Sequence, residues 1–284
     1  MSTNCLVCGA AYKPSRLPGL LACEACGFTT ADVALSGKEL ENLYGAGYFA
    51  GGEYRDYVSE RSMIEKHFRL RLKKLLEYIP DPGSKRLFEI GSAYGFFLWV
   101  AREKFASVAG IDISREAAEY AAGTLGLRVE AADFSQYEFP APPDVVCLWD
   151  TVEHLSRPDL YLERIARSMM PGGILALTTG DVGSLVARFR GAKWRQIHPP
   201  THLHYFSKAT LRRLLERYGF EIRFSGYDGV YRSLDTMAYM ILVLRRKQPR
   251  LYAALKRTGL LGYDLYLNLY DLLFVIAEKR RVPD

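Results

Sequence analysis

The sequence predicts an α/β fold with a doubly wound, mostly parallel sheet, and two segments support this prediction. Residues 86–96 read Arg-Leu-Phe-Glu-Ile-Gly-Ser-Ala-Tyr-Gly-Phe, a short apolar run that ends at a glycine just before a helix. Residues 108–114 read Val-Ala-Gly-Ile-Asp-Ile-Ser, a second buried strand with an acidic residue at its carboxyl end. Strand, glycine turn, helix, strand and acid in this order are typical of a nucleotide-cofactor site.

The glycine turn also indicates which cofactor the site takes. Gly91 lets the backbone approach a ligand closely, and Asp112 can accept hydrogen bonds from ribose hydroxyls. The spacing Glu89-x-Gly91-x-x-x-Gly95 lacks the first glycine of the pyrophosphate-binding pattern, which disfavours an NAD-dependent dehydrogenase. Adenosylmethionine carries adenosine but no phosphate, so it needs only the close turn and the ribose carboxylate. The alternative role for Asp112 is to stabilise the start of the next helix through the helix dipole.

These residues give the chain a resemblance to the class I S-adenosylmethionine-dependent methyltransferases, whose first motif is acidic-x-Gly-x-Gly-x-Gly, with Ala93 here at the middle glycine. Later segments follow in the same order: a third strand, a strand at 144–149, and a turn at 170–173 before a fifth strand. The resemblance implies a Rossmann-like, seven-stranded sheet with strands one to five parallel and the last strand antiparallel. It also implies that the cofactor is held by Glu89, Gly91, Ala93, Gly95, Asp112, Ile113, Asp133, Phe134 and Trp149.

Within that set, the resemblance places Asp133 at the amino group of adenine. The alternative for Asp133 is an ordinary acidic residue in a loop.

Two cysteine pairs near the start of the sequence predict a metal site. Cys5-x-x-Cys8-Gly and Cys23-x-x-Cys26-Gly are separated by fourteen residues, the spacing of tetrahedral zinc knuckles. Four thiolates close the zinc coordination shell, so the predicted role is structural. A pair of disulfides is the alternative, but no apolar secretory leader precedes the pairs and the chain otherwise looks intracellular. The fifth cysteine, Cys147, lies in an apolar strand and is expected in the core.

The chain divides into three predicted parts. Residues 1–36 form the zinc ribbon, residues 37–83 a lid loop and an N-terminal helix, and residues 84–284 the methyltransferase domain. The glycine- and tyrosine-rich lid, residues 44–57, either covers the cofactor or acceptor or packs as a linker. Apolar residues at helical spacing predict the helix between residues 59 and 79.

A helical insertion is expected at about residues 226–269, between strands at 220–225 and 272–278. Its apolar stretches lie beside basic ones. This composition favours a roof over the acceptor pocket, with a membrane interface and a dimer face as the alternatives.

Polar side chains that could act on an acceptor follow the fourth strand. Residues 149–154 read Trp-Asp-Thr-Val-Glu-His and resemble the Glu-His element of many small-molecule and sugar methyltransferases. Residues 196–207 hold three of the five histidines and resemble a segment of methyltransferases encoded among bacterial polysaccharide and natural-product genes. An imidazole can take the proton of an acceptor hydroxyl as the methyl group arrives. The candidate catalytic residues are Glu153, His154, His202 and His204, with a structural role as the alternative for each histidine.

The same segment leaves a metal-dependent reaction open. Ubiquinone-pathway O-methyltransferases and small-RNA 3′-terminal 2′-O-methyltransferases hold a divalent metal with a similar acidic-x-x-Glu-His sequence, and Asp150 stands here at their first glutamate. Oxygen ligands and a single imidazole favour Mg²⁺ or Mn²⁺ over zinc. In this alternative the protein methylates RNA and uses Asp150, Glu153, His154 and a downstream histidine.

Composition and charge narrow the choice of partners. The 284 residues are 49% hydrophobic, enough for a large core, and carry a net charge of +6. This mild charge fits an anionic acceptor such as a nucleotide sugar, an anionic membrane surface or RNA, and DNA is not expected. Few basic and aromatic residues lie between the cysteine pairs, which disfavours a non-enzymatic zinc-ribbon binding protein. No segment reaches 18 uninterrupted apolar residues, so a cytoplasmic protein is expected, with peripheral membrane contact as an option.

The sequence therefore predicts a methyltransferase that uses S-adenosylmethionine and a histidine base. The expected acceptor is a hydroxyl or carbon of a sugar, nucleotide sugar or related small metabolite. Neither the identity of the acceptor nor the oligomeric state follows from the sequence.

Overall fold

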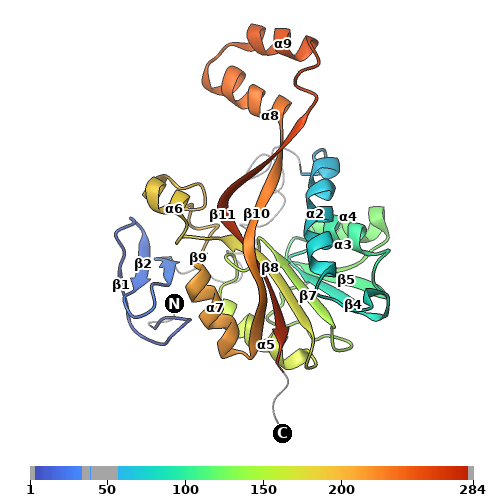
Figure 1. Ribbon diagram of the computed structural model, residues 1–284, viewed down its shortest axis with the longest axis vertical. Helices are drawn as coiled ribbons and strands as arrows, with labels where there is room; N and C mark the ends of the chain where they lie inside the picture. Colours follow the sequence, from blue (N-terminus) through green and yellow to red (C-terminus); the bar gives the residue numbers. More distant parts are fainter. Residues whose placement is uncertain (1–3, 34–38, 40–56, 281–284) are drawn as a thin grey trace.

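A seven-stranded sheet organises the computed structural model, which describes residues 4–33, 39 and 57–280 (Figure 1). The strand order is β10-β11-β8-β7-β4-β5-β6. The first five strands of the sheet in chain order pair in parallel, and β11 pairs antiparallel with both β8 and β10. This confirms the predicted Rossmann-like methyltransferase sheet. The strands are β4 (Arg86–Ile90), β5 (Ser107–Asp112), β6 (Arg128–Ala131), β7 (Val145–Trp149), β8 (Ile174–Gly180), β10 (Phe220–Ser233) and β11 (Asp264–Lys279).

Helices cover both faces of this sheet, because its inner strands are apolar on both sides (Figure 1). One face packs against α2 (Arg61–Leu76), α3 (Phe96–Ala101) and α4 (Arg115–Leu125). The other packs against α5 (Pro158–Ser168) and α7 (Lys208–Arg217). The helix expected from apolar spacing, α2, is present, and a capping box formed by Ser207 and Thr210 begins α7. Short helical turns η2 (Pro82–Ser84), α6 (Leu185–Arg190) and η3 (Gly191–Lys193) lie in the connections.

The N-terminal ribbon forms a second, four-stranded sheet together with a strand from the methyltransferase part. The order is β1 (Tyr12–Pro14), β2 (Leu20–Cys23), β3 (Thr29–Ala31) and β9 (His204–Tyr205). Between them, the fully buried Phe28 contacts the rings of His204 and Phe206, with centroids 5.8 and 5.2 Å away. The pairing of β3 with β9 and the buried contacts of Phe28 therefore attach the ribbon to the rest of the chain.

The predicted helical insertion is shorter than expected because the strands on both sides are longer. Strand β10 continues to Ser233 and β11 begins at Asp264, and the two pair with each other over this added length. Backbone pairing needs no apolar pattern, so the end of the apolar run does not mark the end of either strand. Beyond the sheet, the paired strands form an arm that carries α8 (Leu234–Ala238), the π-helix η4 (Tyr239–Arg245) and α9 (Pro249–Arg257).

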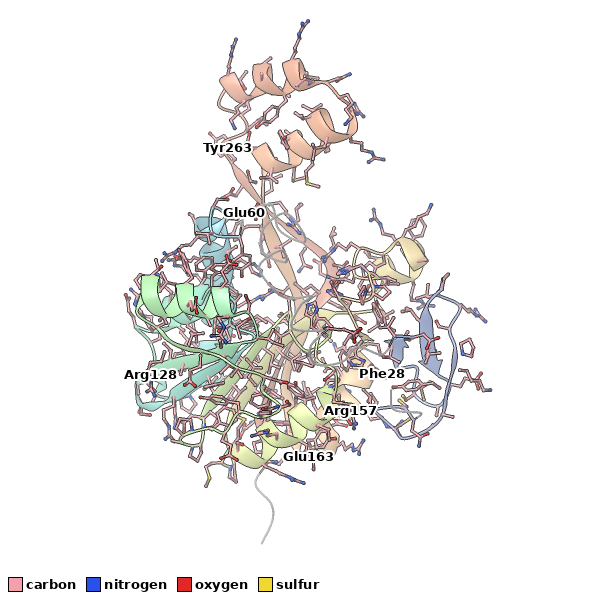
Figure 2. The ribbon with its side chains drawn as sticks, turned by 180° about the vertical axis from the view of Figure 1, so that it is seen from behind. Phe28, Glu60, Arg128, Arg157, Glu163 and Tyr263 are labelled. Carbon is pink, nitrogen blue, oxygen red and sulfur yellow. The ribbon has the colours of Figure 1, made fainter. Side chains whose placement is uncertain are left out.

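We call residues 234–263 the arm tip. No residue of its three helices is buried. Figure 1 shows these helices standing beyond the sheet rather than over it, and Figure 2 shows Tyr263 at the same end, far from Arg128 and Glu163. These helices therefore cover neither face of the sheet, and their role as a roof over the acceptor pocket stays a prediction. Within the described residues, no helix has both the length and the apolar character that a bilayer crossing requires.

Most of the predicted lid, residues 44–56, lies outside the described residues. Its last residue, Tyr57, is buried against the glycine turn that follows β4. The ring of Tyr57 stacks on Tyr94 and Phe96 with centroid separations of 5.6 and 5.4 Å.

Candidate active site

The turn between β4 and α3 presents bare backbone at the carboxyl end of the sheet. Gly91 and Gly95 have φ of 74° and 75°, a conformation that glycine adopts without strain. The N–H groups of Gly91 and Ser92 donate to the carbonyl of Ile111 at the end of β5, at 2.9 and 3.0 Å. A Cβ atom on Gly91 would lie 2.6 Å from Oγ1 of Thr151. The turn is thus packed too closely for a side chain at this position.

Asp112 is buried at the end of β5 and holds the same turn in place. Its Oδ2 accepts a hydrogen bond from the N–H of Ala93 at 2.7 Å, and its Oδ1 accepts one from Ser114 at 2.8 Å. Burial raises the pKa of Asp112, while these two N–H groups lower it. Ala93 has φ of 45°, so the left-handed conformation is kept at the motif's middle position without glycine.

Glu89 lies buried beneath this turn. Burial and the neighbouring Asp112 raise its pKa well above the usual range. Among the described residues, no group forms a hydrogen bond with its Oε2. A buried carboxyl oxygen without a partner suits a cationic ligand group such as the ammonium of adenosylmethionine. The bare backbone of the turn suits the adenosine half of the same cofactor.

Asp133 and Phe134 follow β6, where the resemblance places the adenine of the cofactor. Asp133 accepts hydrogen bonds from the N–H of Ser135 at 2.8 Å and from the hydroxyl of Tyr161 at 2.9 Å. Phe134 is buried against the ring of Tyr161, 5.4 Å away between centroids. The half-buried Ile113 follows Asp112 directly. Helix α5, which carries Tyr161, thus fixes the position of the loop.

Trp149 ends β7 and Asp150 follows it, beside a buried arginine that belongs to no motif of the sequence. The ring of Trp149 packs edge-on against Phe97 and Phe274 in the core. The guanidinium of Arg71, from α2, lies 5.3 Å from the Trp149 ring centroid and donates to Oδ2 of Asp150 at 3.0 Å. Asp150 has φ of 51°, so this ion pair stabilises a strained residue.

Arg71 also joins this site to the base of the arm. Its Nε donates to Oδ2 of Asp228 in β10 at 2.7 Å, and His67 lies 3.1 Å from the same oxygen. The neighbouring His67 and the positive charge of Arg71 lower the pKa of Asp228 to about 2 despite its burial, so it stays ionised at neutral pH. One buried guanidinium thus links α2, the loop after β7 and β10.

The structure brings two of the candidate histidines together. The rings of His154 and His202 meet edge to face, 4.6 Å apart between centroids. Backbone contacts make this pairing possible, because the carbonyl of Glu153 accepts hydrogen bonds from the N–H groups of Leu203 and His204. Nδ1 of His154 lies 2.8 Å from the carbonyl oxygen of Thr201. A carbonyl only accepts, so Nδ1 carries the proton and the lone pair of the neutral ring is on Nε2.

Burial keeps these groups neutral. It lowers the pKa of His154 to about 4, although the Thr201 carbonyl favours the protonated ring. It lowers the pKa of His202 to about 2, with His154 adding to the effect. Burial and then Asp150 raise the pKa of Glu153 to about 8, and Oε2 of Glu153 has no hydrogen-bond partner among the described residues. One ligand atom from each of Glu153, His154 and His202 lies within 4.8 Å of the others.

Comparison with known protein families identifies the chain. Residues 62–223, more than half of its length, match Methyltransf_23, a methyltransferase domain family. The chain belongs to this family. It is therefore a methyltransferase that uses S-adenosylmethionine, and the non-enzymatic alternative is excluded. No curated protein sequence matches the chain.

Solved structures of low sequence identity share the methyltransferase fold. An S-adenosylmethionine-dependent methyltransferase from Archaeoglobus fulgidus is 19% identical with a TM-score of 0.54, covering 78% of this chain and 99% of that one. One from Thermotoga maritima is 17% identical with a TM-score of 0.54, covering 85% and 98%. A chain from the complex of the Haloferax volcanii Trm112 methyltransferase activator with a methyltransferase is 15% identical with a TM-score of 0.55, covering 80% and 96%.

The third candidate histidine of the methyltransferase lies in a different environment. His204 belongs to β9, and its Nδ1 is 3.1 Å from the hydroxyl of Thr30 in the ribbon. Its ring stacks on Phe28. Burial lowers its pKa to about 4. His204 therefore contacts the ribbon, whereas His154 and His202 contact each other.

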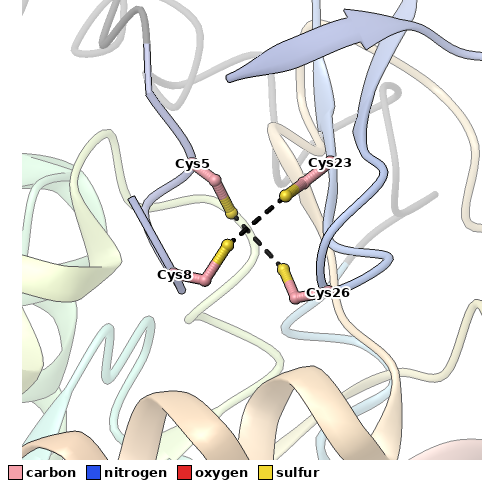
Figure 3. Close-up of side chains that lie close together, drawn as sticks. All are labelled: Cys5, Cys8, Cys23 and Cys26. Atoms are coloured by element: carbon pink, nitrogen blue, oxygen red, sulfur yellow. Dashed lines mark hydrogen bonds between the residues drawn. The ribbon is translucent and has the colours of Figure 1, made fainter. Parts of the chain in front are cut away.

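The four ribbon cysteines point toward one centre (Figure 3). Sγ of Cys5 lies 3.5 Å from that of Cys26, and Sγ of Cys8 lies 3.4 Å from that of Cys23. A tetrahedral zinc site with Zn–S bonds of about 2.3 Å needs sulfurs about 3.8 Å apart, so only a small outward movement is required. All four thiols are free, and so is the buried core residue Cys147. The geometry is compatible with the predicted zinc ribbon.

Arg71 and Asp228 were missed because they lie 157 positions apart. One signal was available in the sequence. Arg71 directly precedes Leu72 and follows Phe68 by three positions, so it is a charged residue on the apolar side of a predicted helix. A buried charge needs a partner, but the sequence does not say which one.

Proposed function

We propose that this methyltransferase transfers a methyl group to a hydroxyl, or an acidic carbon, of a sugar, nucleotide sugar or related small metabolite, with His154 as the general base. The observation that carries the proposal is the contact between Nδ1 of His154 and the Thr201 carbonyl. This contact fixes the tautomer in which Nε2 can accept a proton.

The residues on the cofactor side have a binding role in this proposal. Glu89, Gly91, Ala93, Gly95 and Asp112 form the crevice for adenosylmethionine, with Ile113, Asp133, Phe134 and Trp149 around its adenosine end. The cofactor supplies an electrophilic methyl group on a good leaving group. The protein then has to hold the acceptor in line with that methyl group and exclude water.

His154 would take the acceptor's proton as the new bond forms. Its low pKa keeps the ring neutral at pH 7, ready to accept. Asp150 favours the protonated ring electrostatically, which offsets part of the cost of charging a buried imidazole. His202 and Glu153 position the ring and the acceptor. His204 supports the same loop from the ribbon side and is not the base.

The sugar assignment rests on the resemblance of residues 196–207 to polysaccharide and natural-product methyltransferases. Two aromatic residues in or near this segment, which could serve as flat walls for an acceptor, have other contacts. Trp194 is buried and donates its indole N–H to Asp271 at 2.8 Å, and Tyr205 donates to the carbonyl of His202 at 3.0 Å. Specificity for a sugar therefore depends on polar groups rather than on these rings.

A methyl-transfer screen tests this proposal. The purified enzyme is incubated with isotopically labelled adenosylmethionine and panels of nucleotide sugars, free sugars and short RNAs. We expect labelled product with a sugar-containing small molecule, and product formation slower by about 10² to 10⁴ after His154→Gln. Calorimetry with adenosylhomocysteine shows whether the variant still folds and binds. Product with RNA alone would contradict the proposal.

A metal-dependent reaction is the second candidate, because Glu153, His154 and His202 converge. It uses a set different from the one expected from sequence, since the Asp150 carboxylate pairs with Arg71. Under this candidate, a chelator abolishes activity, Mg²⁺ or Mn²⁺ restores it, and RNA is the acceptor. Activity that survives chelation would exclude the metal-dependent reaction.

For the ribbon, we propose a structural zinc ion held by Cys5, Cys8, Cys23 and Cys26. Thiolate ligands need a reducing compartment, which agrees with a cytoplasmic location. Metal analysis should give one zinc per chain, and Cys8→Ser together with Cys26→Ser should lose it. Cys147→Ser is the matched control, because this thiol lies in the sheet core. Zinc retained by the double variant would contradict the assignment.

A further inference from the structure

The arm tip exposes apolar side chains that its own folding does not use. Its helices contact each other through polar groups and rings: Tyr239 packs on Tyr252, and Asp235 accepts hydrogen bonds from Tyr252 and Lys256 at 2.9 Å each. The large apolar residues lie outside this contact. Those at least 45% exposed are Met240, Ile241, Leu244, Leu251, Leu260 and Tyr263.

The arm tip also concentrates positive charge. Between residues 234 and 263 the only acidic residue is Asp235, which already binds Lys256. Six basic residues against one acidic residue give this segment a net charge of +5, nearly the whole chain's +6. The basic residues are Arg245, Arg246, Lys247, Arg250, Lys256 and Arg257.

The arm holds this charge away from the sheet. Strand β11 pairs with β8 only from Leu272 to Glu278, and from Asp264 to Leu267 it pairs with β10 alone. At about 3.3 Å per residue, the segment between Asp264 and Leu272 spans roughly 25 Å. Lys66 of α2 braces it, 3.3 Å from Asp264 and 4.8 Å from the ring centroid of Tyr231. Figures 1 and 2 show the tip standing clear of the sheet and ribbon.

We propose that the arm tip binds an anionic membrane surface. Basic side chains contact lipid phosphates while the exposed leucine, isoleucine and methionine side chains enter the boundary between headgroups and acyl chains. This occupant uses both properties of the tip. A nucleic acid would neutralise the charge but leave the aliphatic side chains in water. A second copy would bring one +5 surface against another.

Vesicle sedimentation with the full zinc-loaded chain tests the proposal. We expect binding to phosphatidylcholine vesicles that contain about 30% phosphatidylglycerol, and much weaker binding to phosphatidylcholine alone or at high salt. Each basic residue at the surface contributes roughly fivefold in affinity. The triple variant Arg245→Gln, Arg246→Gln, Lys247→Gln should therefore bind about 100-fold more weakly.

Two further variants keep the test specific. Lys208→Gln, Arg212→Gln, Arg213→Gln changes the charge equally at exposed positions of α7 and should change binding little. Ile241→Ser with Leu251→Ser keeps the charge and should weaken binding roughly tenfold. Unchanged adenosylhomocysteine affinity in each variant shows that the fold and cofactor site are intact. Since no acceptor is present, the result does not depend on the proposed reaction.

Three results would overturn the inference. The first is absence of binding to the anionic vesicles. The second is an equal loss of binding in the α7 variant, because binding would then follow overall charge. The third is a tip-dependent dimer or RNA complex without vesicle binding, which would assign the surface to another occupant.

Discussion

The two sides of the proposed active site are built differently. On the cofactor side, the proposed residues lie in or just after the consecutive strands β4, β5 and β6. Backbone N–H groups there hold the carboxylate of Asp112. On the acceptor side, His154 and His202 are 48 positions apart in the sequence, and buried side chains with displaced pKa values form the site. The proposed cofactor side thus depends on local turns. The acceptor side depends on one long loop held by the ribbon and by Glu153.

The largest effect should come from changing the acceptor side alone. His154→Gln removes the proposed base and should lower kcat by about 10² to 10⁴ while the affinity for adenosylhomocysteine stays the same. Steady-state kinetics with the acceptor found by the screen measure the first quantity, and calorimetry measures the second. Thr201→Ala is the control, since it keeps the carbonyl that orients His154. An unchanged kcat in His154→Gln would exclude the base assignment.

A substitution on the cofactor side should instead weaken cofactor binding, the quantity that His154→Gln leaves unchanged. Asp112→Ala removes a carboxylate that holds the turn and faces the expected ribose, and charge-assisted hydrogen bonds contribute about 1.5–3 kcal/mol each. We expect adenosylmethionine to bind about 10- to 100-fold more weakly by calorimetry. Asp144→Ala is the matched control, because Asp144 accepts a hydrogen bond from the N–H of Arg86 at the opposite end of these strands. Equal affinity in both variants would remove Asp112 from the cofactor site.

Gly91→Ala tests whether the cofactor side needs bare backbone. Residue 91 has a left-handed backbone conformation, and its new Cβ would collide with Thr151. The free energy of unfolding, measured in urea, should therefore fall by about 1–3 kcal/mol. Gly123→Ala, in α4 with no atom within 4 Å of the new Cβ, should instead stabilise by up to about 1 kcal/mol. The same sign for both substitutions would contradict the close packing at Gly91.

The smallest effect should be a pH dependence of the free energy of unfolding. Its sign for His154 and His202 is opposite to its sign for Glu153. His154 and His202 titrate at about 4 and about 2 when folded but near 6.5 when unfolded. Below pH 6.5 the unfolded chain therefore binds more protons, and stability falls as the pH falls. Glu153 has the opposite sign: its pKa of about 8 makes stability fall as the pH rises from about 4.5 to about 8.

Thermal unfolding separates these contributions. Between about pH 7 and about pH 5, the Tm of His202→Gln should fall less than that of the wild type. Each kcal/mol of unfolding free energy corresponds to roughly 2–4 °C in Tm. Glu153→Gln should reduce the loss between about pH 5 and about pH 8. Identical pH profiles in wild type and both variants would show that these groups titrate normally.

The features that the sequence predicted are those that depend on neighbours in the chain. Gly91, Asp112 and the two cysteine pairs each belong to a short motif, and the strands around them are short apolar runs. The Arg71–Asp228 ion pair and the strands of the arm depend on partners far away in the sequence or on backbone pairing. The contact of His204 with Thr30 is also of this kind. Which histidine is the base remains a prediction, because the sequence offers His154, His202 and His204 alike.

The pairing of β3 with β9 sets an order of events during biosynthesis. Thr30 leaves the ribosome 174 residues before its partner His204, a delay of roughly 10–35 s at about 5–20 residues per second. During that interval one edge of the ribbon has no strand beside it, and a metal ion already bound by the cysteines would hold the nascent hairpin together. The last step in completing the histidine loop is then the return of the newly made chain to its own beginning.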